Sequence, residues 1–150
     1  MVLRNIHQLR LIIRRLHAQK KKVVFTNSCF DLLHVGHLKL FEYCKKQGDY
    51  LIVAVNSDRS IRAIKGPSRP IIPEQDRAHL CAGLKTVDAV IIFNEETPEK
   101  LIAHIRPDVL VKGGDWKLNS IIGRDAVKKV VRMPLIKGKS TTAIIQKIRT

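Results

Sequence analysis

Apolar residues in this chain fall into short continuous runs that alternate with longer mixed segments. The runs suit strands covered on both faces, and they occupy residues 22–27, 50–56, 89–93, 109–111 and 130–133. The segments between them carry helix signals such as an apolar face, a capping residue or a first-turn proline. We predict helices over residues 36–47, 59–64, 73–84, 97–106, 121–128 and 143–149. This alternation predicts an α/β fold: a Rossmann-like, five-stranded parallel sheet with helices on both faces.

A leading segment, residues 1–21, precedes the first of these strands. Within residues 2–18, apolar residues recur at spacings of three, four and three, which predicts one helical stripe: Ile6, Leu9, Ile13 and Leu16. We predict that this helix packs either on the sheet domain, residues 22–150, or on a partner subunit. The stripe is also the reason to expect a homodimer or a larger homo-oligomer.

Length and composition narrow the class of protein. A chain of 150 residues, 45% of them hydrophobic, suffices for one domain with its own core. No apolar run approaches the ~20 residues that cross a bilayer. Arg14 and Arg15 interrupt the apolar stretch near the N-terminus, which argues against a signal peptide. The three cysteines include no Cys-x-x-Cys pair, so we expect no disulfide framework, no zinc site and a cytoplasmic location.

The formal net charge of +15 calls for an anionic partner or substrate. A basic surface can neutralise nucleic-acid phosphates, or it can belong to an enzyme that handles small polyanions. The basic residues are spread along the chain, and no zinc-finger, homeodomain or RNA-recognition pattern is visible. We therefore expect small-molecule substrates, and we disfavour nucleic acid and membrane as partners.

Candidate chemistry is concentrated in residues 26–37, which connect the first predicted strand to the next helix. The first turn of a helix offers unpaired N–H groups and the positive end of its dipole, which suits a phosphate. Gly36 allows the backbone to approach a ligand closely because it has no Cβ. His34 and His37 can face one phosphate cluster if the helix begins near Val35.

The string Cys29-Phe30-Asp31-Leu32-Leu33-His34-Val35-Gly36-His37 resembles the signature of the cytidylyltransferase-like nucleotidyltransferases. The resemblance implies a nucleotide α-phosphate beside the two histidines, attacked by a phosphorylated substrate. It assigns these residues to the nucleotide site: Cys29, Phe30, His34, Gly36 and His37. Asp31 is predicted to order the turn through hydrogen bonds to backbone amides. Family members usually carry glycine where this chain has Ser28, which leaves the detail of substrate recognition open.

Two further segments combine glycine with polar residues after a predicted strand. Gly138-Lys139-Ser140-Thr141-Thr142 precedes the last helix, so its hydroxyls suit a helix cap, a phosphate contact or both. The resemblance adds that a Gly-x-Ser-Thr-Thr segment lies at the triphosphate in these enzymes. Lys112-Gly113-Gly114-Asp115 is either a simple turn or, by the same resemblance, the segment against the nucleotide base and ribose. Trp116 is predicted to pack rather than to stack on the base.

A predicted loop begins with Lys65 and contains Arg69. It is either a solvated basic loop or a flexible clamp that closes over phosphates, with Lys65 as its mobile charge. Lys65-Gly66-Pro67-Ser68-Arg69-Pro70 and the segment ending in Asn56-Ser57-Asp58 resemble one branch of the family, the adenylyltransferases of ADP-heptose synthesis. This similarity spans nearly the whole chain. It implies that four residues contact the phosphorylated acceptor: Asn56, Asp58, Lys65 and Arg69.

The branch resemblance implies a reaction in which AMP passes from ATP to D-glycero-β-D-manno-heptose 1-phosphate and pyrophosphate leaves. His34, His37 and Lys65 are the predicted catalytic residues, because an anionic nucleophile needs positioning and charge neutralisation rather than a strong base. Mg²⁺ is expected on the triphosphate, bound mainly through phosphates and water, without a dedicated set of protein ligands. Two alternatives stay open: nucleotidyl transfer to another acceptor, such as glycerol phosphate or FMN, and a nucleic-acid-binding module on the same fold.

Overall fold

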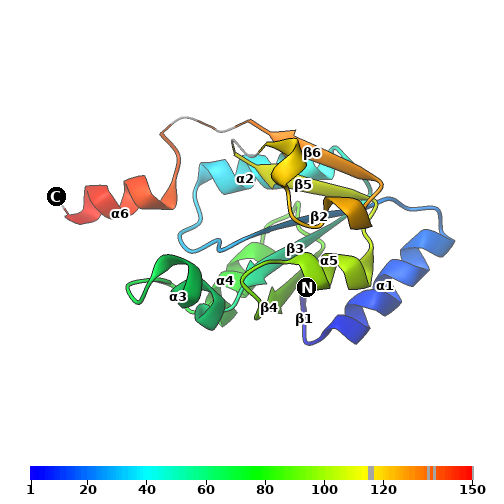
Figure 1. Ribbon diagram of the computed structural model, residues 1–150, viewed down its shortest axis with the longest axis horizontal. Helices are drawn as coiled ribbons and strands as arrows, with labels where there is room; N and C mark the ends of the chain where they lie inside the picture. Colours follow the sequence, from blue (N-terminus) through cyan, green and yellow to red (C-terminus); the bar gives the residue numbers. More distant parts are fainter. Residues whose placement is uncertain (115–116, 135, 137, 150) are drawn as a thin grey trace.

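Figure 1 shows a parallel sheet with helices packed on its two faces. The computed structural model describes residues 1–114, 117–134, 136 and 138–149. Within these residues, six strands pair in parallel in the order β1-β4-β3-β2-β5-β6. The strands are β1 Val2–Leu3, β2 Val23–Ser28, β3 Tyr50–Asn56, β4 Ala89–Phe93, β5 Val109–Gly113 and β6 Lys129–Met133. The helices are α1 Ile6–Ala18, α2 Val35–Lys45, α3 Asp58–Lys65, α4 Glu74–Ala82, α5 Glu99–Ile105 and α6 Thr141–Arg149, with 3₁₀ turns η1 Leu118–Ser120 and η2 Arg124–Ala126.

The predicted fold class is confirmed, with two differences in its elements. β1 adds a sixth strand at the sheet edge beside β4, because two apolar residues are too short a run to stand out in the leading segment. The helix predicted over residues 121–128 is wrong, since the short turn η2 forms there instead. Gly123 has a φ of +86°, and a Cβ there would lie 2.6 Å from Cδ1 of Ile102 in α5. A left-handed residue packed against a neighbouring helix interrupts any continuous α-helix.

The central strands bury both of their faces, which explains their continuous apolar runs. Phe25 and Ile52 lie in a core that includes residues of α1 and α5. Val24 and Val53, the alternate residues of the same strands, lie in a second core with residues of α2 and α4. The prediction of helices on both faces is therefore confirmed.

The leading helix α1 packs on the sheet domain, the first of the two predicted alternatives. Asn5 caps it, since its Oδ1 accepts a hydrogen bond from the N–H of Gln8 at 3.0 Å. Leu9 and Ile13 of the predicted stripe are buried in the core shared with α5. Homo-oligomer formation stays a prediction.

The order of the strands places the candidate site. From β2 the chain builds outward through β3 to β4, and then returns to add β5 on the other side of β2. Ligands of open parallel sheets bind outside the carboxyl ends of the strands at such a reversal. The segments singled out in the sequence follow β2, β3, β5 and β6, so they meet at this end of the sheet.

Candidate active site

A cleft of about 580 Å³ opens over the carboxyl ends of the central strands. Most residues predicted to bind the nucleotide line it: Cys29, Phe30, His34, Gly36, His37, Lys112, Gly113, Gly114, Ser140, Thr141 and Thr142. Three of those predicted to bind the acceptor also line it: Asn56, Lys65 and Arg69. Gly138 and Asp58 are not among the lining residues. Asp115 and Trp116 lie outside the described residues.

His34 is the N-cap of α2, and the backbone holds its ring in place. Its backbone is extended, and its Nδ1 accepts a hydrogen bond from the N–H of Gly36 at 3.0 Å. In the neutral imidazole this places the proton on Nε2, which becomes a donor. Burial, and then the charge of Lys139, lowers the pKa of His34 below its usual value. A Cβ at position 36 would lie 2.8 Å from two ring atoms of His34, so this geometry requires glycine.

His37 stacks on His34 at the mouth of α2, which begins at Val35, one residue before the predicted start. The two ring centroids are 3.9 Å apart, and Phe30 meets the His37 ring edge-on at 5.2 Å. Burial, and then the neighbouring His34 and Lys65, lowers the pKa of His37 to about 4, so the ring is neutral at pH 7. Its Nδ1 is buried and has no hydrogen-bond partner among the described residues. A buried polar atom without a partner is uncommon in folded proteins, so Nδ1 of His37 is an unsatisfied position beside the cleft.

Lys112, near the end of β5, brings a partly buried ammonium group to the cleft. Its Nζ donates a hydrogen bond to Oδ1 of Asn27 at 2.5 Å. Burial lowers the pKa of Lys112 to about 8, which leaves the group mainly protonated at pH 7. Three more basic side chains line the cleft: Lys65, Arg69 and Lys139. A concave surface of this sign favours polyphosphates.

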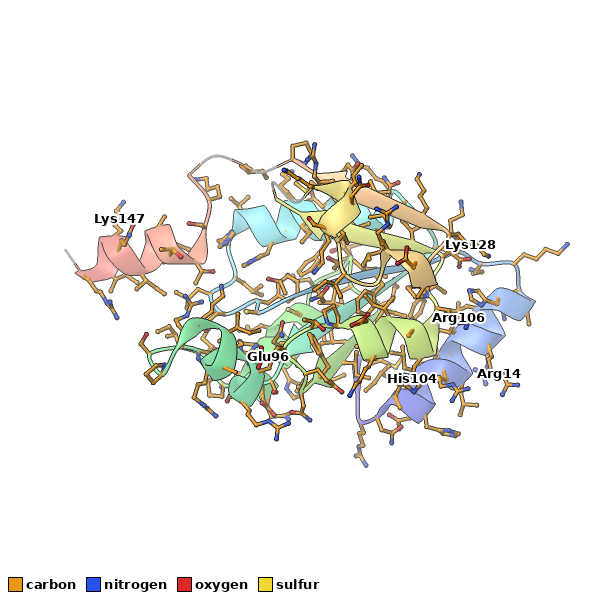
Figure 2. The ribbon with its side chains drawn as sticks, in the orientation of Figure 1. Arg14, Glu96, His104, Arg106, Lys128 and Lys147 are labelled. Carbon is orange, nitrogen blue, oxygen red and sulfur yellow. The ribbon has the colours of Figure 1, made fainter. Side chains whose placement is uncertain are left out.

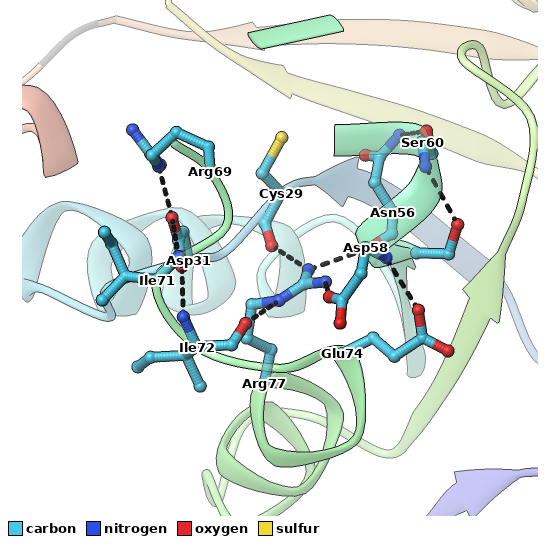
Figure 3. A network of polar contacts seen from close by, with 11 residues as sticks. Cys29, Asp31, Asn56, Asp58, Ser60, Arg69, Ile71, Ile72, Glu74 and Arg77 are labelled. Carbon is cyan, nitrogen blue, oxygen red and sulfur yellow. Dashed lines mark hydrogen bonds and ion pairs between the residues drawn. The ribbon is translucent and has the colours of Figure 1, made fainter. Parts of the chain in front are cut away.

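Asp31 ties the loop after α3 to the turn after β2 (Figure 3). Its buried carboxylate accepts hydrogen bonds from Nε of Arg69 at 2.5 Å and from the amides of Ile71 and Ile72 at 2.8 and 2.9 Å. Burial alone raises the pKa of Asp31, but these hydrogen bonds and the Arg69 charge outweigh it and hold the pKa below its usual value. The predicted bonding to backbone amides is confirmed, although the amides belong to a loop some 40 residues away.

Lys65 is the last residue of α3 rather than the first residue of a loop. Ser57 caps this helix, since its Oγ accepts a hydrogen bond from the N–H of Ser60 at 3.2 Å, and Gly66 ends it with a φ of +88°. The Lys65 side chain is exposed and lines the cleft. The mobility of the predicted clamp stays a prediction.

Ser140 caps α6 and also lines the cleft. Its Oγ accepts a hydrogen bond from the N–H of Ala143 at 3.1 Å. No residue of α6 that the structure describes is buried, and Figure 1 shows the helix projecting from the sheet. A long hydrogen bond of 3.5 Å, from Oγ1 of Thr141 to the carbonyl of Leu32, connects its first turn to the turn after β2.

Several residues of the cleft wall were not predicted from the sequence. The loop after β4 contributes Glu96, Thr97 and Pro98, and Figure 2 shows Glu96 close to α3. This loop follows the buried strand β4, and that position in the sequence could have indicated that the loop belongs to the cleft. Apolar residues from the C-terminal third also line the cleft: Ile121, Ile122, Met133, Pro134 and Ile136. These are scattered in the sequence and form no motif, so only the fold brings them together.

Part of the net charge lies away from the cleft. Arg106 and Lys128 precede β5 and β6, and Arg14 lies in the last turns of α1, so all three belong to the end of the sheet where strands begin (Figure 2). Lys128 Nζ is 2.8 Å from Asp108 Oδ1. Helix C-termini lie at this end, and their dipoles favour cations. These charges therefore have a structural explanation that needs no ligand.

A metal ion would find few protein ligands in the cleft. Among the described residues, no three His, Cys, Asp or Glu side chains converge in a way that suits a metal. The buried carboxylate of Asp31 already has Arg69 and two amides as partners.

No helix in the described ranges is long and apolar enough to span a membrane.

The fold and the cleft define a nucleotide-binding α/β protein, since paired histidines at a helix mouth lie at the reversal of a parallel sheet. Residues 25–147 match the family model described as cytidylyltransferase-like. The chain belongs to this family, so the predicted family resemblance is confirmed.

Curated relatives are similar along most of this chain. The bifunctional protein HldE of a Nitratiruptor species is 48% identical over 148 residues, which are 99% of this chain and 32% of that protein. HldE of Syntrophotalea carbinolica is 52% identical over 132 residues, 85% of this chain and 27% of that protein. The chain therefore spans about a third of the length of these relatives.

Solved structures share the fold. The lipopolysaccharide core biosynthesis protein from Thermoplasma volcanium GSS1 has a TM-score of 0.67 at 31% identity, over 78% of this chain and 99% of that one. A pantoate-β-alanine ligase from Francisella tularensis has a TM-score of 0.64 at 16% identity, over 99% of this chain and 77% of that one. At that identity the ligase shows the fold alone.

Proposed function

We propose that this chain is an adenylyltransferase. It transfers AMP from ATP to D-glycero-β-D-manno-heptose 1-phosphate, and it releases pyrophosphate and ADP-heptose. One observation carries the proposal: the stacked histidine pair, with His37 neutral, lies in a cationic cleft of a cytidylyltransferase-like domain. The Thermoplasma volcanium protein, named for lipopolysaccharide core biosynthesis, supports a sugar-phosphate acceptor.

The reaction asks the protein for positioning rather than for proton removal. A phosphate oxygen of the acceptor attacks the α-phosphorus of ATP, and the bond from that phosphorus to the bridging oxygen breaks as pyrophosphate leaves. The nucleophile is already an anion, so no general base is needed. His34, through Nε2–H, and His37 donate hydrogen bonds to the phosphates, and Lys65 screens the two anions as they approach.

The cleft divides into a nucleotide side and an acceptor side. On the nucleotide side, Lys112 and the Ser140–Thr142 segment hold phosphates, and apolar side chains such as Ile122 and Met133 suit a nucleobase. On the acceptor side, Arg69 holds the sugar phosphate and Glu96 accepts hydrogen bonds from sugar hydroxyls. β4, which precedes Glu96, is the second neighbour of β2. At the usual spacing of strands, the carboxyl ends of β2 and β4 are therefore ~10 Å apart. This distance is about the length of a phosphorylated sugar.

Mg²⁺ accompanies the triphosphate in this proposal, held by phosphate oxygens and water, and it supplies further charge neutralisation. The substrates are small molecules of the cytoplasm, which is the location we propose.

We also propose a homo-oligomer, since Leu11 of α1 is 52% exposed beside the buried stripe. Sedimentation that shows a monomer at micromolar concentration contradicts the homo-oligomer.

The test is a pyrophosphate-release screen of ATP and CTP against heptose 1-phosphate, hexose 1-phosphates, glycerol 3-phosphate and FMN. ATP with heptose 1-phosphate is expected to give the highest kcat/KM, with product and pyrophosphate in equal amounts. A different best pair supports transfer to another acceptor. Absence of release with every pair, together with retention of RNA or DNA, supports a binding module and overturns the proposal.

A further inference from the structure

Arg77 is a completely buried arginine on α4, with an exposed fraction of 0%. Its Nε donates a hydrogen bond to the carbonyl of Ile72 at 2.8 Å, and its Nη2 lies 2.7 Å from Oδ1 of Asp58. Its Nη1 donates to two carbonyls, those of Cys29 at 2.6 Å and Asn56 at 2.8 Å (Figure 3). Burial of an arginine is costly unless its charge and donors are matched. Here every nitrogen of the guanidinium has an acceptor.

The two carbonyls that Nη1 binds mark the point where β2 and β3 separate. The last paired residues of these strands are Ser28 and Val55. Cys29 and Asn56 are the next residues on each strand, and the guanidinium bridges their carbonyls. Arg77 thus connects the two chain segments by side-chain hydrogen bonds at the point where the backbone hydrogen bonds between β2 and β3 end.

This bridge fixes the relative positions of two strand ends that both carry cleft residues, Cys29 after β2 and Asn56 of β3. β2 has β3 on one side and β5 on the other. The carbonyl bridge holds the ends of β2 and β3 together, and residues that follow β2, β3, β4 and β5 all line the cleft. Arg77 itself is not among the lining residues, so it does not contact a ligand there.

The same side chain holds three parts of the cleft at fixed relative positions. Cys29 opens the turn that leads to the histidine pair. Asp58 begins α3, whose last residue is Lys65. Ile72 ends the loop that Asp31 ties down together with Arg69. One rigid, five-donor fork can make these contacts together, and an ammonium group cannot.

We propose that Arg77 is a positioning residue for nucleotidyl transfer: it sets the distance between the histidine turn and the acceptor-side cations. This inference rests on the proposed function. A shift of about 1 Å between reacting groups can cost ~10²-fold in rate. Arg77→Lys is therefore expected to lower kcat ~10²-fold, with ATP affinity nearly unchanged. It is also expected to raise the ratio of pyrophosphate to nucleotide sugar above one, because water competes with a misplaced acceptor.

The experiment measures kcat, KM for the acceptor, ATP affinity by calorimetry, this ratio and Tm for Arg77→Lys. Leu9→Ala is the control, because it opens the core under α1 and destabilises the chain away from the cleft. It should lower Tm and leave both kcat per folded molecule and the ratio unchanged. Arg77→Ala adds a second readout, since guanidinium at millimolar concentration should restore part of its turnover.

The outcomes separate this inference from the proposed function. A normal kcat and a ratio of one in Arg77→Lys, with a Tm loss like that of Leu9→Ala, assign Arg77 a structural role and overturn the inference alone. If Arg77→Lys does not fold, Asp58→Asn weakens one of the four contacts without emptying buried space. Asp58→Asn should then lower kcat several-fold and raise the ratio, and unchanged values overturn the inference. A wild-type chain that turns over no acceptor refutes the proposed function and, with it, this inference.

Discussion

The two sides of the cleft are held in place by different means. The acceptor side, residues 56–77, is joined to the turn after β2 by buried charged groups, above all Asp31 and Arg77. Beyond the histidine turn and Lys112 of β5, the nucleotide side comes from the residues that follow β5. There β6 has no fully buried residue, and neither has α6 in the described ranges. From this difference we expect that the acceptor side is preorganised and that the nucleotide side gains order when its ligand binds.

Among the variants that compare the two sides, the largest effect is expected at Lys65, an exposed cation on the otherwise anchored acceptor side. Its charge matters most while the two anions approach, so Lys65→Ala should depress kcat more than ATP binding. A loss of roughly 10²-fold in kcat corresponds to one strong electrostatic contact. Calorimetry of ATP binding beside turnover provides the measurement. An equal fall in ATP affinity makes Lys65 a ground-state binder, and no change in either makes it a surface lysine.

Asp31→Asn loosens the acceptor side selectively. An asparagine has one acceptor oxygen, which the amides of Ile71 and Ile72 should keep. Its NH2 group then faces the donor Nε of Arg69 and breaks the contact that fixes this guanidinium. The KM for the acceptor should rise about tenfold, equivalent to about 1.4 kcal/mol, with ATP affinity unchanged. Ser140→Ala on the nucleotide side is the matched variant and should show the reverse. If both variants affect both ligands equally, the division of the cleft is wrong.

Hydrogen exchange compares the two sides without a mutation. Addition of ATP should increase protection of amides in residues 117–149, because this side has few buried contacts of its own. Amides of residues 69–77 should be protected already in the free chain, since Asp31 and Arg77 hold that loop. If amides on both sides are equally protected before ATP is added, the claim that only the acceptor side is preorganised is wrong.

The smallest effect concerns pH and the stability of the fold. The pKa of His37 is lowered from 6.5 to about 4 in the folded chain. The unfolded chain therefore binds more protons between these values, and the free energy of unfolding should fall as the pH drops from about 6.5 toward 4. Urea unfolding of His37→Gln at pH 7 and pH 5 checks this. The variant should lose less stability than the wild-type chain, and an identical loss contradicts the shift.

The sequence predicted most of the cleft because its chemistry occurs in contiguous strings at strand ends. His34, His37 and Ser140 could be placed there from local pattern and strand order alone. Arg77 could not, because its role depends on where β2 and β3 separate in space. The apolar wall around Ile122 and the turn at Gly123 depend on packing against distant elements, which no local periodicity records.

One measurement tests the central claim, adenylyl transfer at the histidine pair. It compares the ADP-heptose and pyrophosphate formed from ATP and heptose 1-phosphate by the wild-type chain, His37→Ala and His104→Ala. His104 is an exposed α5 histidine that is not among the cleft-lining residues, so it provides the matched control. We expect equal amounts of both products from the wild-type and His104→Ala chains, and a ~10²–10³-fold lower kcat for a folded His37→Ala. Undiminished turnover by His37→Ala, or no transfer by the wild-type chain, would contradict the account.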